Sequence, residues 1–176
     1  MPERIDATFD DATFCSTPDS GLVPTAVVIQ TRTNLAVKFL NDRARLPEYA
    51  TPGSACFDIF GTADDVTIAP GEAAVIGTGL AFEIPDNHVM LVYSRSGHGF
   101  KQGLRLANTT GIIDSDYRGE LMVKLHNDSD VPQTIPGQSR CAQAMIIPVQ
   151  QVAFKVVDDL SHTQRGIGGF GSTGTA

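Results

Sequence analysis

The sequence lacks tryptophan, and aromatic residues make up only 7% of its 176 positions. A broad aromatic platform for stacking single-stranded nucleic acid is therefore not expected. Acidic residues outnumber basic ones by 20 to 13, which gives a net charge of −7. A chain of this sign repels polyphosphate backbones at long range, so we expect no general binding of nucleic acid.

Long apolar runs and paired cysteines are also missing. No stretch of 18 apolar residues occurs, so no membrane-spanning segment is predicted. Cys15, Cys56 and Cys141 are odd in number and show no Cys-x-x-Cys spacing, which argues against a disulfide framework and a structural zinc site. The first eleven residues hold four acidic side chains and one arginine, unlike a basic leader, so we expect a cytoplasmic protein.

Glycine and proline are plentiful, with 17 and 10 residues, and they separate short apolar stretches. Most of these stretches are too short for helices, and Leu121, Val123 and Leu125 alternate with residues of the opposite face. The pattern predicts an all-β protein, a β-sandwich or jelly roll, with one short helix at 96–102. Strands are predicted at 36–40, 66–69, 73–84, 89–93, 104–106, 121–126 and 141–149.

The organisation along the chain divides into three parts. Residues 1–33 are acidic, rich in Thr, Asp and Ser, and weakly patterned apart from the apolar run 23–29. We interpret them as a partly disordered N-terminal extension with one extra strand; the alternative is that they begin the same domain. Residues 34–164 are predicted to form the domain, and residues 165–176 a mobile C-terminal arm.

One stretch suited to phosphate chemistry follows a predicted strand, with the sequence YSRSG at 93–97. Arg95 offers a cation, its serine neighbours a hydroxyl, and Gly97 an unobstructed backbone N–H, all of which suit a phosphate oxygen. An ordinary turn with a solvated arginine is the plainer interpretation.

A second stretch, GIIDSDYRG at 111–119, lies between two strand patterns and has the composition of a hairpin turn. Asp114 follows two branched apolar residues, where a carboxylate needs a partner or a task. It could serve as a general base for water. Asp116 would share its face in an extended strand, so spacing leaves both carboxylates open as the base.

The third stretch is RGIGGFGSTG at 165–174, which formally contains G-x-G-x-x-G. The dinucleotide interpretation is rejected, because no helix or βαβ unit follows to hold a pyrophosphate. A flexible tail is the plain interpretation. Its arginine, hydroxyls and Phe170 could instead clamp phosphates, stack on a flat ring and close over a nucleotide.

In this order, five segments closely resemble the five motifs of the trimeric deoxyuridine triphosphatase (dUTPase) family. The segments are 52–59, 94–97, 108–119, 136–143 and 165–174, and the likeness covers residues 36–174. Five motifs in register are a far more specific signal than any one of them.

The resemblance implies a jelly-roll homotrimer with active sites at subunit interfaces, each closed by the C-terminal arm of another subunit. It implies hydrolysis of dUTP to dUMP and pyrophosphate with Mg2+, which keeps uracil out of DNA and supplies dUMP for thymidylate synthesis. Asp114 would then activate the water that attacks the α-phosphorus. Asp58 would hold a water in the shell of the metal rather than touch the metal itself.

The resemblance also implies a set of substrate contacts. Those to the phosphates are Arg95, Ser96, Gly97 and Gln143. Those that read uracil are Asn108, Ile112, Ile113 and Met122, around the expected hairpin, with Tyr117 packed under the deoxyribose. Those of the arm are Arg165, Gly171, Ser172 and Thr173, with Phe170 over the uracil ring.

Departures from the family pattern leave every implied catalytic group in place. Ser94 stands where proline is usual, and Cys56 where glycine is usual. Phe57 lacks the hydroxyl of the common tyrosine. Cys141 is expected to be a small buried apolar residue rather than a nucleophile, and His98 a surface or helix residue rather than a ligand.

Three other functions compete with the triphosphatase. A dCTP deaminase shares the fold and several motifs but lacks the aromatic Gly-rich arm. A nucleotide-gated binding module would use residues 1–33 to hold a regulatory protein partner. A purely structural jelly roll conflicts with the intact catalytic set.

Overall fold

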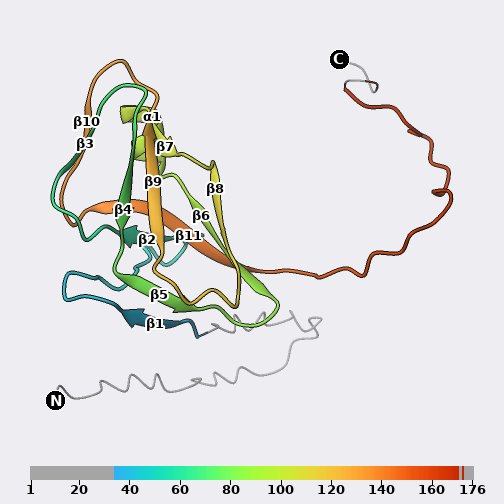
Figure 1. Ribbon diagram of the computed structural model, residues 1–176, viewed down its shortest axis with the longest axis horizontal. Coiled ribbons are helices and arrows are strands. Elements are labelled where there is room, and N and C mark those ends of the chain that lie inside the picture. Colours follow the sequence, from blue (N-terminus) through green and yellow to red (C-terminus); the bar gives the residue numbers. More distant parts are fainter. Residues whose placement is uncertain (1–33, 171, 173–176) are drawn as a thin grey trace, which may run out of the picture. The chain divides into compact units, whose positions relative to one another are not determined.

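The computed structural model describes residues 34–170 and 172. Figure 1 shows how its strands and helix follow one another along the chain. Eleven strands and one short helix make up this part of the chain. The elements are β1 (Ala36–Phe39), β2 (Phe57–Phe60), β3 (Val66–Ile68), β4 (Ala73–Gly77), β5 (Leu80–Glu83), β6 (His88–Tyr93), α1 (Ser96–Gln102), β7 (Leu104–Leu106), β8 (Thr110–Ile113), β9 (Met122–Asn127), β10 (Gln133–Ile135) and β11 (Arg140–Pro148).

The strands pair in an antiparallel manner within four sheets. A four-stranded sheet has the order β2-β11-β6-β8, and a three-stranded sheet has the order β4-β9-β7. The remaining strands form two two-stranded sheets, β1-β5 and β3-β10. With nine residues, β11 is the longest strand, and it lies between β2 and β6.

The hydrophobic core follows from alternation along the strands. Leu121, Val123 and Leu125 are buried, whereas Met122 and Lys124 are exposed, which confirms the predicted two faces of this segment. The buried apolar side chains form one cluster contributed by both larger sheets and their neighbours. Burial of such side chains is the main term that stabilises a fold of short strands.

The predicted helix is confirmed at Ser96–Gln102, and it ends where Gly103 takes φ 65°. The predicted continuous strand at 73–84 is wrong, because Thr78 and Gly79 separate β4 from β5. Gly79 has φ 65°, a left-handed conformation that breaks an extended strand.

Three strands escaped the sequence analysis: β2, β8 and β10. All four residues of β2 are buried, so its sequence FDIF shows no alternation between two faces. The other two strands are four and three residues long and carry polar residues within the pattern.

The predicted extension at 1–33, with its expected strand at 23–29 and its regulatory partner, lies outside the described residues. Within the described part of the chain, no helix is long and apolar enough to cross a membrane.

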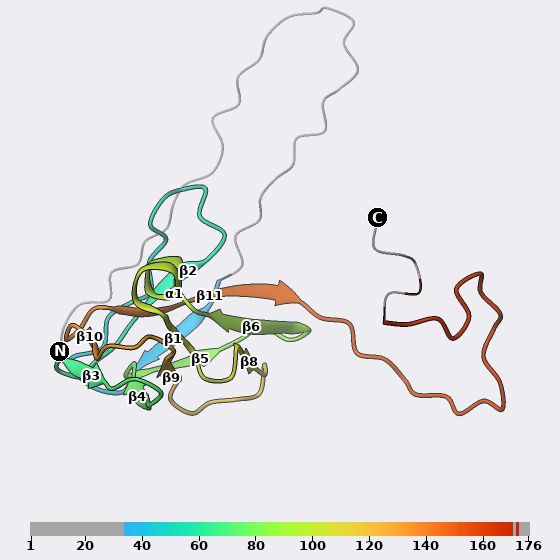
Figure 2. The same ribbon diagram turned by 90° about the horizontal axis from the view of Figure 1, so that it is seen from above.

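The segment that follows β11 has neither helix nor strand in residues 149–170, and Figure 2 shows it continuing from the end of that strand. Nearly all of its side chains are exposed, including Phe154 and Phe170.

We predict that Gly79→Ala destabilises the protein by about 1–2 kcal/mol, because an L-residue is strained in the left-handed region. An added Cβ would also meet the Asn41 amide nitrogen at 2.6 Å. Urea unfolding measures the effect, with Gly53→Ala as the control. A Cβ at Gly53 meets nothing within 4 Å, so this variant should keep or slightly raise the free energy of unfolding. Equal stabilities of the two variants would contradict the prediction.

Candidate active site

The register of the four-stranded sheet brings three of the sequence motifs into one row. Asp58 on β2 lies opposite Gln143 on β11, and Gln143 lies opposite Tyr93 at the end of β6. The row continues to Thr110 at the start of β8. Gln143 then donates a hydrogen bond from its side-chain nitrogen to the carbonyl oxygen of Ser94, over 2.9 Å. Segments far apart in the sequence thus meet at one level of the sheet.

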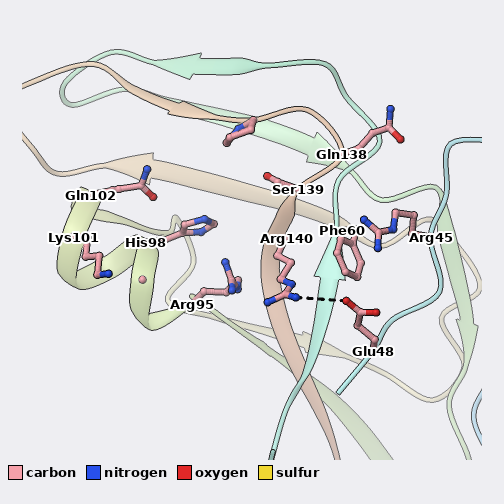
Figure 3. Close-up of a pocket in the computed structure, with 12 residues that line it drawn as sticks. Arg45, Glu48, Phe60, Arg95, His98, Lys101, Gln102, Gln138, Ser139 and Arg140 are labelled. Atoms are coloured by element: carbon pink, nitrogen blue, oxygen red, sulfur yellow. Dashed lines mark ion pairs between the residues drawn. The ribbon is translucent and has the colours of Figure 1, made fainter. Parts of the chain in front are cut away.

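An ion-pair cluster forms beside this row. The Nε of Arg95 donates to the Oδ1 atom of Asp58 at 3.0 Å. The Nε of Arg140 lies 3.4 Å from the other carboxylate oxygen, and its Nη2 lies 3.6 Å from the Oε1 atom of Glu48. Figure 3 shows Arg95, Arg140 and Glu48 around one cavity. With Asp58 only 7% exposed, these contacts fix both guanidinium groups next to the start of α1.

Ser96 and Gly97 begin α1 and are exposed, as a phosphate contact requires. The preceding residue, Ser94, has a second role that the sequence did not reveal. Its hydroxyl accepts a hydrogen bond from the backbone N–H of Leu106 at 2.8 Å. The segment that carries Arg95 is therefore tied to β7 as well as to β11.

The residues expected to read a base line a separate cavity of about 410 Å³. Asn108, Ile112, Ile113 and Met122 all contribute to its walls. Thr109 takes φ 64° between Asn108 and β8, a rare conformation for a β-branched residue that points to a functional constraint. This volume suits a small planar ligand with a few polar contacts.

The stretch 111–119 was expected to be a hairpin turn, but the two strands that flank it, β8 and β9, do not pair with each other. β8 pairs with β6, whereas β9 pairs with β4 and β7. The stretch instead connects two sheets. The two strands therefore diverge from the turn, and the cavity is lined from both of them.

Asp114 and Tyr117 lie next to this cavity, in a smaller one of about 230 Å³. Both Asp114 and Asp116 are exposed, but Asp114 is the one that lines the hollow. The hydroxyl of Tyr117 donates to the carbonyl oxygen of Glu120 at 3.0 Å. A Cβ at Gly119 would collide with the Tyr117 ring, so glycine allows the ring to lie flat against the backbone.

The residues of the expected C-terminal arm, 165–174, are not among those that line these two cavities. The Nε of Arg165 donates to the carbonyl oxygen of Gly168 at 2.9 Å, within the arm itself. Phe170 is fully exposed, and Ser172 is exposed as well. Gly171 and Thr173 lie outside the described residues.

His98 was expected to be a surface or helix residue. It lies in the predicted helix and is only 8% exposed. Burial, together with the nearby charge of Arg95, lowers its pKa below the usual value. Its neighbours Arg45, Lys101, Ser139 and Arg140 were assigned no role from the sequence, since nothing in their spacing predicts that they meet.

Among residues 34–170 no group of three or more His, Cys, Asp or Glu side chains is placed to hold a metal ion. Asp58 places one carboxylate between two arginines, Arg95 and Arg140.

Comparisons with known proteins point to one family. A family model described as dUTPase matches residues 42–174. The deoxyuridine 5'-triphosphate nucleotidohydrolase of Nautilia profundicola is 49% identical over 140 residues, covering 80% of this chain and 98% of that protein. The protein of the same name from Bordetella parapertussis is 48% identical over 144 residues, covering 80% and 97%.

Solved structures give the same result. The Staphylococcus bacteriophage 80alpha dUTPase with dUPNHPP superposes with a TM-score of 0.75 at 33% identity, covering 82% of this chain and 100% of that one. The fold is that of a jelly-roll nucleotide hydrolase, which confirms the predicted fold class. More particularly, the chain belongs to the dUTPase family.

We predict that Cys141 resists alkylation in the native protein. It is 0% exposed, and burial raises the pKa of its thiol to about 12, so almost no thiolate exists at about pH 8. Cys56 is partly exposed and should react with iodoacetamide, although burial and Asp58 raise its pKa. The measurement is peptide mass spectrometry on a Cys15→Ser background, with the unfolded protein as control. Rapid labelling of native Cys141 would show that it is no inert core residue.

Proposed function

We propose that this protein hydrolyses dUTP to dUMP and pyrophosphate, through attack of water on the α-phosphorus. The reaction would keep uracil out of DNA and supply dUMP for thymidylate synthesis. One observation supports it most directly: a phosphate-type half-site around Arg95 and a base-type half-site around Asn108 line different cavities. The two halves form a complete site if the phosphate half of one subunit meets the base half of another, as in the homotrimer that we propose.

The phosphate half would be formed by Arg95, Ser96, Gly97 and Gln143. Arg95 is already held by Asp58 at 3.0 Å, so its guanidinium needs little reordering to receive a phosphate oxygen. Ser96 and Gly97 offer a hydroxyl and a backbone N–H, and Gln143 offers the amide hydrogen that it does not donate to Ser94. Positioning and charge stabilisation of this kind are the main requirements of phosphoryl transfer.

Mg2+ is the cofactor that we propose, carried with the triphosphate. An ionised carboxylate has about four lone-pair sites, so the two arginine contacts of Asp58 leave room to accept a bond from a metal-bound water. When bound, the metal neutralises negative charge on the phosphates. The role of Asp58 would be to orient that water while it holds Arg95 in place.

The base half would read uracil in the cavity of about 410 Å³ between β8 and β9. Asn108 and nearby backbone groups would hydrogen-bond the edge of the ring, while Ile112, Ile113 and Met122 pack against it. A tight apolar wall excludes the thymine methyl by its shape. The amino group of cytosine fails for another reason, because it places a donor where uracil has an acceptor.

Tyr117 would lie under the deoxyribose and exclude a 2′-hydroxyl. Its hydrogen bond to the Glu120 carbonyl and its contact with Gly119 hold the ring in one orientation. Asp114, next to it in the same hollow, would be the general base that takes a proton from the attacking water.

The arm of another subunit would close the site. Arg165, Gly171, Ser172 and Thr173 would contact the distal phosphates, and Phe170 would cover the uracil ring. Full exposure of Phe170 leaves its apolar surface available, so covering a bound base would be favourable by about 1.5–3 kcal/mol. Closure would also exclude bulk water from the reaction.

The decisive experiment is pyrophosphate release from dUTP, dCTP, dTTP and UTP, each measured with Mg2+ and with EDTA. We expect rapid release from dUTP alone, and only in the presence of metal. Ammonia from dCTP would instead identify a deaminase, and nucleotide binding without any release would identify a binding module.

A second prediction separates the two exposed carboxylates. Asp114→Asn should lower kcat for dUTP by about 10²- to 10⁴-fold with little change in KM, because it removes the base but keeps the shape. Asp116→Asn is the matched control and should stay near the wild-type rate. Full activity of Asp114→Asn, or equal losses in both variants, would remove Asp114 from the role of base.

A further inference from the structure

The segment 114–120, which carries Asp114 and Tyr117 between β8 and β9, has neither helix nor strand. Most of its hydrogen bonds to described partners stay inside the segment. The backbone N–H of Tyr117 donates to the Asp114 carbonyl oxygen at 3.2 Å, and its hydroxyl donates to the Glu120 carbonyl oxygen at 3.0 Å. Arg118 donates to two nearby carbonyl oxygens of the same segment. These bonds shape the segment but do not fix its place in the fold.

The side chain of Glu120 links this segment to the core. Its Oε1 atom accepts a hydrogen bond from the backbone N–H of Gly79 at 2.8 Å, across 41 positions of the sequence. Among the described residues, no other side chain of 114–120 forms a hydrogen bond or ion pair outside the segment. Glu120 is half-buried and lines the same hollow as Asp114 and Tyr117.

The partner of Glu120 is itself firmly held. Gly79 lies in the break between β4 and β5, with φ 65°. Beside it, Thr78 is 0% exposed, and its hydroxyl donates to the carbonyl oxygen of Leu121 at 2.6 Å. The bond made by Glu120 therefore extends a buried set of contacts by one residue toward Tyr117.

The surroundings leave room for a carboxylate at this point. A Cβ added to Gly77 would meet the Oε1 atom of Glu120 at 2.8 Å, so glycine lets the carboxylate lie against β4. A carboxylate oxygen is a stronger acceptor for a backbone N–H than a neutral oxygen. The bond to Gly79 thus ties the backbone of Glu120 to the sheet.

Tyr117 depends on that backbone for its orientation. Its side chain is 43% exposed, so packing alone leaves the ring considerable freedom. The hydroxyl is bound to the carbonyl oxygen of Glu120, and the ring lies against Gly119. A displacement of Glu120 would move the acceptor that holds the ring.

We propose that Glu120 is a positioning residue that sets the discrimination between deoxyribose and ribose. It acts through its bond to Gly79, which holds the carbonyl group that receives the Tyr117 hydroxyl. The assignment to the sugar rests on the proposed function, in which Tyr117 lies under the deoxyribose. Without the bond to Gly79, the ring would withdraw and admit a 2′-hydroxyl.

The first test compares kcat/KM for dUTP and for UTP in the wild type and in Glu120 variants. We expect Glu120→Ala to lower the dUTP-to-UTP ratio by about tenfold, as the loss of one hydrogen bond to a charged group would. Glu120→Gln keeps an oxygen acceptor and should restore most of the ratio. A merely structural role would lower both values by the same factor and leave the ratio unchanged.

Two further variants serve as control and as replacement. Glu72→Ala is the matched control, because Glu72 is an exposed glutamate before β4 that lines neither cavity of the base half. Gly77→Ala displaces the carboxylate while Glu120 remains in the chain. The flexible end of the glutamate side chain can yield to the new Cβ, so we expect this variant to fold even if Glu120→Ala does not, and to lower the ratio as well.

A second readout needs no nucleotide. The chain has three tyrosines, at 49, 93 and 117. In protein with isotope-labelled tyrosine, Glu120→Ala should shift the ring resonances of Tyr117, assigned by their loss in Tyr117→Phe. The signals of Tyr49, which packs against Phe57, should stay in place.

The outcomes separate the two proposals. Unshifted Tyr117 resonances in Glu120→Ala and Gly77→Ala would overturn the positioning role, whether or not dUTP is hydrolysed. A wild-type dUTP-to-UTP ratio in both variants would overturn the role in sugar discrimination and leave dUTP hydrolysis standing. Shifted resonances in a protein whose wild type hydrolyses neither nucleotide would support the positioning of Tyr117 and overturn the proposed function.

Discussion

The pairing of β11 with both β2 and β6 is the interaction on which the rest of the site depends. It sets Asp58, Gln143 and Tyr93 in one row. A slip of one residue would turn Gln143 to the other face and separate Asp58 from Arg95. The register is held by the buried side chains of β11, Cys141, Ala142 and Ala144, so core packing fixes the position of the charged groups next to it.

The charged cluster around Asp58 also depends on this strand pairing. One nearly buried carboxylate contacts two arginines and leaves each guanidinium with donors still free. Removal of the carboxylate would leave two cations close together, so Asp58 holds both arginine side chains in place without any further ligand. The ion pairs that stabilise this part of the fold therefore also hold the two arginine side chains in position.

Local features of the molecule were readable from the sequence. The short helix at 96–102 and the two faces of 121–126 follow from spacing alone, and the five motifs identify the family. The break at Gly79 was overlooked although the run Gly77-Thr78-Gly79 is a turn signal, whereas the buried strand β2 was not readable, because its four residues show no alternation. The contact between Asp58 and Arg95 joins residues 37 positions apart, and it depends on sheet order, which no local pattern contains. The same reason explains why His98, Lys101 and Ser139 were not recognised as neighbours.

The division of the site into two cavities has a genetic consequence in the proposed trimer. A chain damaged only around Asn108 would keep a working phosphate half, and a chain damaged only around Arg95 would keep a working base half. Mixed assemblies of the two would rebuild some complete sites, so two inactive alleles would complement each other. A single chain carrying both lesions would instead inactivate the sites that it shares with normal subunits. Its allele would therefore be dominant-negative.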